Sequence, residues 1–450
     1  MTGAEVRQVF AAMLPQEEID RLCQQVGVIE RPRKLNLGML VRAMVISAGT
    51  PGGTDQAAVL RSYLECEVPP VARSALSRWF DDPLEQCMAA LAEQALAYAR
   101  AQQVDLSRPL GGVTDWSIVE ATPVTGRDAL RQEWPGTGDD AALKVHTVLS
   151  VGGGAPVPYH FRPAREHDSR HLQIDESWRG YGLLADLASA SLARRRACDA
   201  HGVRFVIRLN EHWKPKVDEL ARGQVTQACF PGSDCDALLA DDTLVLDGRT
   251  SDADGPLGQG RERVPVRLVG VQSPKGDGFF LTTLPPRIGP RQVADLSRVR
   301  WEVALSSRLD KSVNRLAASD AEPPCPLKTL WQASLITSTR AALLAPTHHV
   351  HTRPQPPGAP RPEAPLHPRR LALQLAVSCQ SIAQAFERPG AEATQRWNKI
   401  AAWLTHSGKD PTWRRRPSVL DQRRGWKRQP LARTKPNSGD VSHGHVRAAA

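Results

Sequence analysis

The sequence predicts a mixed α/β protein, in which a central sheet is preceded and followed by helices. Three observations predict this class. Apolar residues recur at helical spacing before residue 108, short β-rich runs separated by turns occupy residues 111–210, and helical spacing returns after residue 291. Strands that are joined to one another by turns and once by a helix are typical of a mixed sheet.

The composition indicates a folded chain of several domains. Its 450 residues are 41% hydrophobic and 24% charged, which is typical of globular proteins. At roughly 150 residues per domain, this length predicts two to four domains. The 58 Lys and Arg residues exceed the 48 Asp and Glu residues, giving a net charge of +10. That balance favours a polyanionic partner, and by itself it fits nucleic acid and a membrane surface equally well.

The same sequence argues against a membrane or secreted protein. It contains no run of about 18 apolar residues, and its first residues lack the basic start and apolar stretch of a secretory signal. Its eight cysteines are scattered without a CxxC pair, so neither a zinc ribbon nor a disulfide framework is expected. A reducing cytoplasm is the expected location.

Residues 1–108 are predicted to form a helical N-terminal domain. Residues 35–48 and 83–100 carry apolar side chains at helical spacing, and a short helix is expected at 74–80 between two proline-containing segments. Such a domain is a candidate reader of DNA ends, and helical packing alone explains the pattern equally well.

Residues 109–222 are predicted to form the first part of the α/β core. Strands are expected at the β-rich runs that Gly- or Pro-rich turns separate, and a helix is expected at 189–200 between the last two of them. The predicted strands are residues 113–122, 143–151, 156–163, 180–188 and 203–210.

The remaining segments follow from changes in composition. Residues 223–290 alternate apolar and polar positions, as in the runs LVLDG, VPVRLVGVQ and GFFLTTL, and are predicted to be a β-rich insertion. Residues 291–345 are expected to return to the core with closing helices, the first of them at about 291–317. Eight prolines at 346–368 predict a linker. Residues 369–450 are expected to contain helices at 369–387 and 392–405, followed by a basic tail.

Two aspartates stand on strands of the predicted core. Asp115 lies in the first strand and Asp186 lies at the end of the fourth. If these strands are neighbours, both carboxylates meet at one edge of the sheet. Carboxylate oxygens are the ligands that Mg²⁺ prefers, and a pair of such ions about 4 Å apart activates a hydroxyl and stabilises a leaving phosphate oxygen. Turn formation or helix capping is the simpler explanation of either residue alone.

The helix at 291–317 carries two basic residues on one face. At 100° per residue, Arg300, position 304 and Lys311 fall within about 40° of one another. Arg300 and Lys311 are therefore placed to hold a phosphate backbone. A third carboxylate is expected between them, and position 304 is alanine.

Taken together, these segments resemble DDE transposases of bacterial insertion sequences, in the group marked by a Tyr-x2-Arg-x3-Glu-x6-Lys helix. Each landmark is modest alone, and their order and spacing over nearly the whole chain carry the resemblance. The landmarks are TDWSIVEAT, WPGTG, LKVH, REHDSR, LLADL, RFVIRLNEHWKP, RWEVALSSRLDKSVNRL and WNKIAAWLTHSGKDP.

The resemblance implies an RNase H-like core with a β-rich insertion. It implies Mg²⁺-dependent cleavage and strand transfer at transposon ends, with Mn²⁺ able to substitute for Mg²⁺. It assigns Asp115 and Asp186 as catalytic metal ligands, and Arg300 and Lys311 as the basic residues of the signature helix. It also implies a homodimer that assembles on paired terminal repeats and acts on target DNA. The expected location is the bacterial cytoplasm, in association with the nucleoid, and no membrane partner is expected.

Two positions depart from this pattern. Ser297 stands where the family has tyrosine, and Ala304 stands where it has the catalytic glutamate. Glu302 lies roughly 160° from position 304 around the helix, so it is a poor substitute. The sequence therefore leaves two functions open: a transposase that cleaves DNA, and a DNA-binding remnant that recognises element ends without cutting them.

The basic tail is predicted to contact DNA. It interleaves Arg and Lys with Trp413 and Trp426, which suits phosphate contacts and base stacking. A solvated basic end that only promotes solubility is the alternative. The predicted contacts are Arg414, Arg415, Arg416, Lys427 and Arg428. A general nucleic-acid-binding protein is a third reading of the whole chain, and it would show no preference for a terminal sequence.

Overall fold

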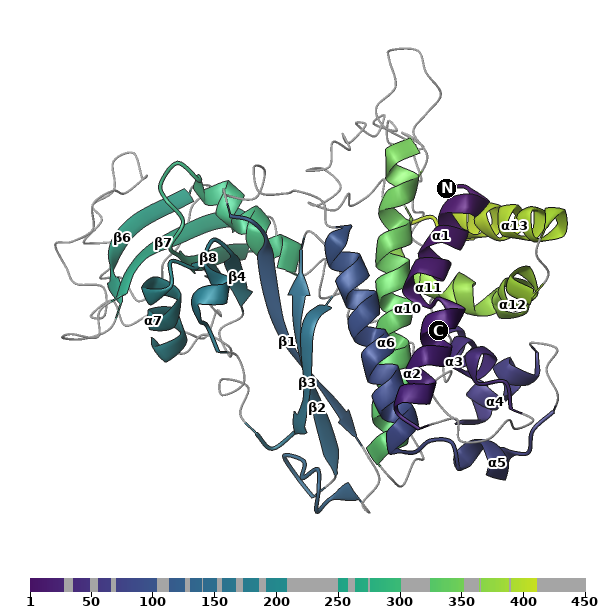
Figure 1. The fold of residues 1–450 in the computed structure, drawn as a ribbon. Helices are drawn as coiled ribbons and strands as arrows, with labels where there is room; N and C mark the ends of the chain where they lie inside the picture. The colour runs from purple at the N-terminus through teal and green to yellow at the C-terminus, as the bar shows by residue number, and fades with distance from the viewer. Residues whose placement is uncertain are drawn as a thin grey trace, which may run out of the picture.

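The molecule has a β-sheet on one side and a helical body on the other, with α6 and α10 between them (Figure 1). The computed structural model describes residues 1–27, 35–48, 56–65, 70–102, 113–125, 130–139, 141–151, 156–166, 173–185, 192–208, 250–257, 264–273, 276–300, 324–351, 364, 366–387 and 390–410.

The helices fall into an N-terminal and a C-terminal group, and one helix lies within the sheet region. The N-terminal group is α1 (Gly3–Met13), α2 (Gln16–Gln25), α3 (Leu37–Ser47), α4 (Gln56–Leu64), α5 (Arg73–Ser77) and α6 (Asp82–Ala101). The C-terminal group is α10 (Pro324–His351), α11 (Pro368–Val377), α12 (Cys379–Glu387) and α13 (Ala391–Ser407). The helix of the sheet region is α7 (Leu192–Ala200), and a further helical segment covers 290–300.

Eight described strands form one mixed sheet, in the order β3-β2-β1-β4-β5-β8-β7-β6. A short 3-10 helix, η3 (Glu176–Trp178), precedes β4. The strands are β1 (Trp116–Thr125), β2 (Ala142–Ser150), β3 (Pro156–Pro163), β4 (Gly182–Ala185), β5 (Arg204–Arg208), β6 (Thr250–Leu257), β7 (Val264–Ser273) and β8 (Gly276–Thr282).

Strands β1 to β5 have the arrangement of an RNase H-like core. β1, β2 and β3 are consecutive antiparallel neighbours, and β4 and β5 then add in parallel on the other side of β1. The predicted fold class is confirmed. The β-rich insertion extends the same sheet, because β8 pairs antiparallel with β5 and is followed by β7 and β6.

Alternating side chains give the sheet two faces with separate cores. The first face carries Trp116, Ile118 and Val124 of β1; Trp116 and Ile118 pack under the 290–300 helix, and Val124 packs in the helical body. The second face carries Leu183 and Phe205, which pack with Cys198 of α7, and the side chain of Val119 adds to this core. The β1–β3 end of the first face thereby joins the sheet to the helical body.

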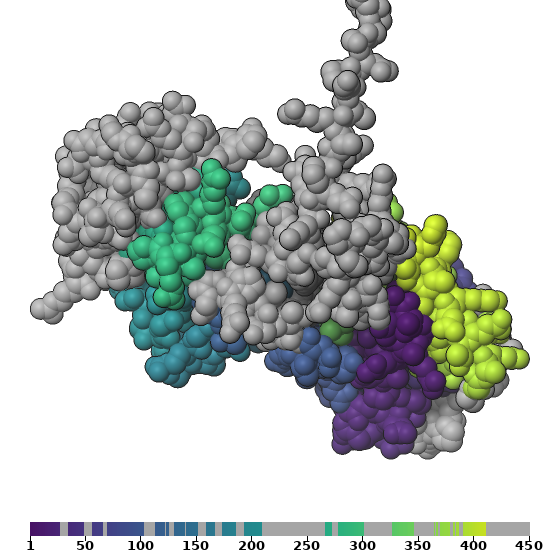
Figure 2. Space-filling view, turned by 90° about the horizontal axis from the view of Figure 1, so that it is seen from above, coloured from purple at the N-terminus to yellow at the C-terminus, as the bar shows by residue number. Residues whose placement is uncertain are grey.

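The N-terminal and C-terminal helices share one hydrophobic core, although they are far apart in the sequence. Phe10 of α1 contacts Trp397 of α13, with ring centroids 5.7 Å apart. The hydroxyl of Thr337 in α10 donates a hydrogen bond to the carbonyl of Val45 in α3. Seen from above, purple α1 and the yellow C-terminal helices lie side by side (Figure 2). The N-terminal helices therefore pack as part of a larger body.

Several element boundaries differ from the sequence-based expectation. α10 continues through Pro346 to His351 and α11 begins at Pro368, so the predicted 346–368 linker is helical at both ends. The single helix expected at 369–387 is two helices that part at Ser378. The predicted LVLDG strand and the 301–317 part of the predicted long helix lie outside the described residues. None of the described helices has the length and apolarity needed to cross a membrane.

Candidate active site at the end of the central strands

Asp115 is a buried residue that contacts the beginning of β1, the end of β2 and the beginning of β4. Only 4% of its surface is exposed. Its Oδ1 accepts a hydrogen bond from the backbone N–H of Trp116 (2.8 Å), and its Oδ2 accepts one from the hydroxyl of Ser150 at the end of β2 (2.5 Å). Its carbonyl accepts from the N–H of Gly182, the first residue of β4 (2.9 Å). These contacts indicate a structural role for the Asp115 carboxylate.

The strand register separates Asp115 from the end of β4. β1 and β4 are parallel, and Trp116 pairs with Gly182 while Ile118 pairs with Leu184. Asp115 thus precedes β1 at the amino ends of the two strands, whereas Ala185 ends β4 at their carboxyl ends. Asp186 follows Ala185 in the sequence and lies outside the described residues. The expected meeting of Asp115 with Asp186 therefore stays a prediction, while Asp115 and Ala185 lie at opposite ends of the paired strands.

Glu120 is the carboxylate of β1 that lies toward the carboxyl end of β4. The paired register ends with Ile118 level with Leu184, and Glu120 lies two residues beyond Ile118 in the direction of the carboxyl end of β4. Because side chains alternate along a strand, Glu120 shares the first face with Ile118. It is half-buried, in a cross-strand row with Thr147 of β2 and Tyr159 of β3.

The Glu120 row lies at the seam between the sheet and the helical body. The ring of Tyr159 is 4.9 Å from that of Trp331 in α10, measured between centroids. Burial, followed by the negative charge of Glu93 in α6, raises the pKa of the Tyr159 hydroxyl, so it stays protonated at neutral pH. Glu120 is therefore a carboxylate between two apolar cores, on the face that the helices cover.

The 290–300 helix covers the first face beside this row. Val293, Leu296 and Val299 pack against the same core as Trp116 and Leu184. Their spacing of three residues puts them on one side of the helix. The two signature positions that the structure describes are Ser297, which is buried, and Arg300, which is half-buried. Ala304 and Lys311 lie outside the described residues.

Arg267 of β7 holds the turn that leads into this helix. Its side chain is fully buried, and its Nη1 donates to the carbonyls of Ile288 (2.8 Å) and Pro285 (3.0 Å), with a longer contact to that of Leu284 (3.4 Å). Hydrogen bonds from a charged donor are stronger than neutral ones. The β-rich insertion thus contributes directly to the position of the helix that carries Arg300.

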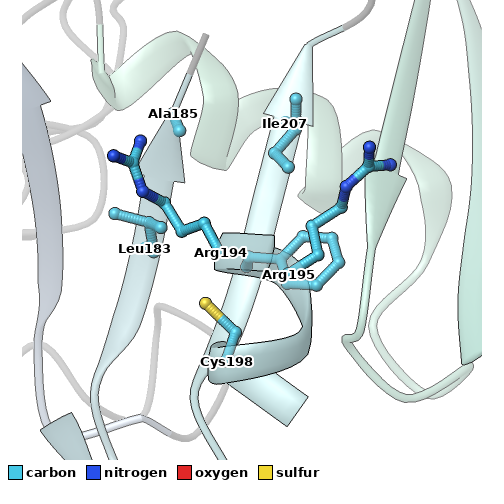
Figure 3. A pocket seen from close by; sticks show the side chains of 7 residues that line it. Leu183, Ala185, Arg194, Arg195, Cys198 and Ile207 are labelled. Atoms are coloured by element: carbon cyan, nitrogen blue, oxygen red, sulfur yellow. The ribbon is translucent and has the colours of Figure 1, made fainter. Parts of the chain in front are cut away.

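A small pocket lies on the second face, between α7 and the parallel strands. Figure 3 shows Arg194 and Arg195 pointing along the strands, toward the ends that carry Ala185 and Ile207. Burial raises the pKa of the Cys198 thiol beside them to about 11, so this cysteine is an unreactive thiol at neutral pH. The lining residues are Leu183, Ala185, Arg194, Arg195, Cys198, Phe205 and Ile207.

The described residues contain no group of three or more His, Cys, Asp or Glu side chains that is arranged to hold a metal ion. One predicted ligand, Asp186, is outside that part of the chain, as are all five predicted tail contacts (Arg414, Arg415, Arg416, Lys427 and Arg428). Of the predicted site residues, the structure thus describes Asp115 and Arg300. The sequence analysis did not weigh Glu120, because only the pairing of β1 with β4 shows which acid of this region lies toward the carboxyl end of β4.

Comparison with known proteins gives a family match for part of the chain. Residues 110–303 match the family described as the transposase DDE domain, and this stretch includes Asp115, Glu120, Asp186 and Arg300. This part of the chain is therefore similar to the transposase DDE domain.

Among solved structures, the chain is similar to a piggyBac transposase synaptic complex with hairpin DNA, studied by cryo-EM. The two chains are 12% identical with a TM-score of 0.46, and the similarity covers 91% of this chain and 89% of that one. Comparison with curated protein sequences gives no match.

Proposed function

We propose that the chain is an insertion-sequence transposase in fold and ancestry, which binds the terminal repeats of its element and lacks one catalytic carboxylate. The transposase DDE match over residues 110–303 supports the class. The observation that supports the site is the parallel register of β1 and β4, which puts Glu120 toward the same end of the sheet as Ala185, the last residue of β4.

In this proposal Glu120 takes the place of Asp115 as the partner of Asp186. Asp186 is the residue that follows Ala185, the last residue of β4, in the sequence. Two carboxylates suit Mg²⁺, and Mn²⁺ is expected to substitute. When bound, such ions polarise the scissile phosphodiester and activate the attacking water or DNA 3′-hydroxyl.

The helix that follows β8 is proposed to complete the site. Thr282, the last residue of β8, pairs with Val206 in the middle of β5, and the 290–300 helix that follows packs on the first face of the sheet. Arg300 and Lys311 are proposed to hold DNA phosphates on either side of position 304.

Alanine at position 304 favours a second function for this copy. A methyl group offers no oxygen to a metal ion, so a site with Glu120 and Asp186 alone lacks its third carboxylate. The chain as it stands is then a DNA-end-binding protein that does not cut, which assembles as a homodimer on paired ends and contacts DNA through its basic tail.

Binding and cleavage by the same samples test both functions. The chain and its Ala304→Glu variant are compared on duplexes that carry the element's terminal repeats and on shuffled duplexes, with Mg²⁺ or Mn²⁺. We expect both proteins to prefer the terminal repeats, and only Ala304→Glu to cleave them. Cleavage by the unmodified chain would show that another residue supplies the third ligand. Equal binding to shuffled DNA would contradict the transposase proposal itself.

A further inference from the structure

Two buried cysteines meet where α2 packs against α6. Cys23 of α2 and Cys87 of α6 are both fully buried, and their Sγ atoms are 3.1 Å apart. Another free and buried cysteine, Cys198, lies in the separate core on the second face of the sheet. Cys23 and Cys87 therefore form a thiol pair that joins positions 64 residues apart in the sequence.

The packing of α2 against α6 includes a second contact. The side-chain amide of Gln94 in α6 donates a hydrogen bond to the carboxylate of Glu18 in α2. From Glu18 to Cys23 along α2, the partner on α6 changes from Gln94 back to Cys87, so the two helices run in opposite directions. They lie side by side in Figure 1. The two sulfur atoms are thus brought together by two packed helices.

The position of the two sulfur atoms suits a disulfide bond. The sulfur atoms of such a bond are about 2.05 Å apart, so those of Cys23 and Cys87 have to approach by about 1 Å. A cross-link restricts the unfolded chain more strongly when the loop that it closes is longer. A bond between α2 and α6 would therefore stabilise the helical body.

The surroundings of the pair determine how it reacts. The hydrogen bond with Cys87, followed by burial, raises the pKa of the Cys23 thiol far above its usual value. Because the thiolate is the reactive form of cysteine, oxidation of the pair is slow at neutral pH. Burial also keeps bulky reagents away from both sulfur atoms, so a suitable oxidant is small.

We propose that Cys23 and Cys87 are a redox-sensitive pair, which forms a reversible disulfide between α2 and α6 in the presence of hydrogen peroxide and thereby stabilises the helical body. In the first step, the sulfur of one cysteine attacks a peroxide oxygen and the O–O bond breaks, giving a sulfenic acid and water. The sulfur of the other cysteine then attacks the sulfenic sulfur, and the hydroxide that leaves takes up the thiol proton. Two thiols and one peroxide thus yield one disulfide and two water molecules.

This inference does not depend on the proposed function. Both cysteines lie in the core of the helical body, whereas Glu120 of the proposed site lies on β1. The predicted effect is a cross-link and a change in stability, which are measured without DNA. A failure of either proposal therefore leaves the other one standing.

Peptide mapping after oxidation tests the pair. The full chain is incubated with hydrogen peroxide, remaining thiols are blocked with N-ethylmaleimide, and the protein is digested with trypsin without reductant. Trypsin places Cys23 in peptide 22–33 and Cys87 in peptide 79–100, each with a single cysteine. We expect these peptides to be recovered joined and to separate on treatment with dithiothreitol. The bond should form faster at about pH 9 than at about pH 7, because more thiolate is present.

Thermal unfolding measures the consequence of the bond. We expect the oxidised chain to unfold at least about 3 °C above the reduced chain. Cys23→Ala and Cys87→Ala should each lose both the joined peptides and this rise. Cys198→Ala is the matched control, because it removes a buried cysteine from the separate core and should keep both. Unfolding of the reduced variants shows whether each one is folded.

Three results would overturn the proposal. The first is separate oxidation of Cys23 and Cys87 to sulfinic or sulfonic acids in unjoined peptides. The second is recovery of both thiols unmodified after other cysteines of the folded chain have been oxidised. The third is a joined pair without a rise in unfolding temperature. The first two results would make the cysteines ordinary packing residues.

Discussion

Asp115, just before β1, and Glu120, within β1, have different environments, and this contrast supports the roles that we propose for them. Asp115 is buried and accepts hydrogen bonds through both carboxylate oxygens, from Trp116 and Ser150. Glu120 is half-buried on the face covered by the helices, toward the carboxyl end of β4. We therefore propose that the Asp115 carboxylate serves the fold and that the Glu120 carboxylate takes part in catalysis.

Substitution of these two residues should therefore affect stability very differently. Asp115→Ala leaves the Ser150 hydroxyl and the Trp116 N–H without their acceptor, so we expect a loss of about 1–3 kcal/mol in the free energy of unfolding. Glu120→Gln keeps its shape at a half-buried position and should change that free energy by less than about 0.5 kcal/mol. Urea denaturation of both variants measures the difference. A larger loss for Glu120→Gln than for Asp115→Ala would contradict this assignment.

At the scale of elements, the sequence predicted most strands and helices because their signals are local. The β3 strand agrees with the expected 156–163, and α6 lies within a residue of the expected 83–100 at either end. α10 was not singled out as one long helix, because the prolines near residue 346 favour a linker when tertiary packing is unknown. In the structure its buried side chains, such as Leu330, pack within the helical body, so packing overrides the local signal.

The turn between β8 and the 290–300 helix depends on a single buried cation. Replacing Arg267 by Met keeps the apolar stem and removes the donor to the carbonyls of residues 284–288. We expect Arg267→Met to cost about 3 kcal/mol and to speed amide hydrogen exchange in residues 284–300 more than in α6. Arg204→Met is the matched control, because exposed Arg204 donates to the carbonyl of Thr283. An equal effect of the two variants would contradict the anchoring role of Arg267.

At the scale of the whole molecule, the described N-terminal and C-terminal helices form one body that packs on the first face of the sheet, at its β1–β3 end. Phe10, Trp397 and Phe386 bring α1, α13 and α12 together by ring contacts. Local periodicity carries no information on such long-range partners, so the sequence indicated separate terminal regions. The same limit explains why the sequence analysis chose Asp115 as a site residue. A strand pattern identifies β1 and β4, but only their register shows which residues of the two strands are level.

The resemblance at sequence level agrees with the transposase DDE match over residues 110–303, while most of the expected signature helix lies outside the described residues. The resemblance selected the acid in the TDW run and did not weigh Glu120 in the following VEAT run. The register of β1 and β4 supports our proposal of Glu120, and the role of position 304 stays a prediction.

The catalytic role proposed for Glu120 is tested most directly by DNA cleavage in variants that carry a glutamate at position 304. Ala304→Glu is compared with Ala304→Glu/Glu120→Gln and Ala304→Glu/Asp115→Asn on the terminal-repeat duplex with Mn²⁺. Asn at position 115 keeps one oxygen acceptor, so that variant is expected to fold. We predict that Glu120→Gln lowers the cleavage rate at least 100-fold while DNA binding is retained, and that Asp115→Asn retains most of the rate. Full cleavage by the Glu120→Gln variant, together with its loss in a folded Asp115→Asn variant, would contradict the site and return the catalytic role to Asp115.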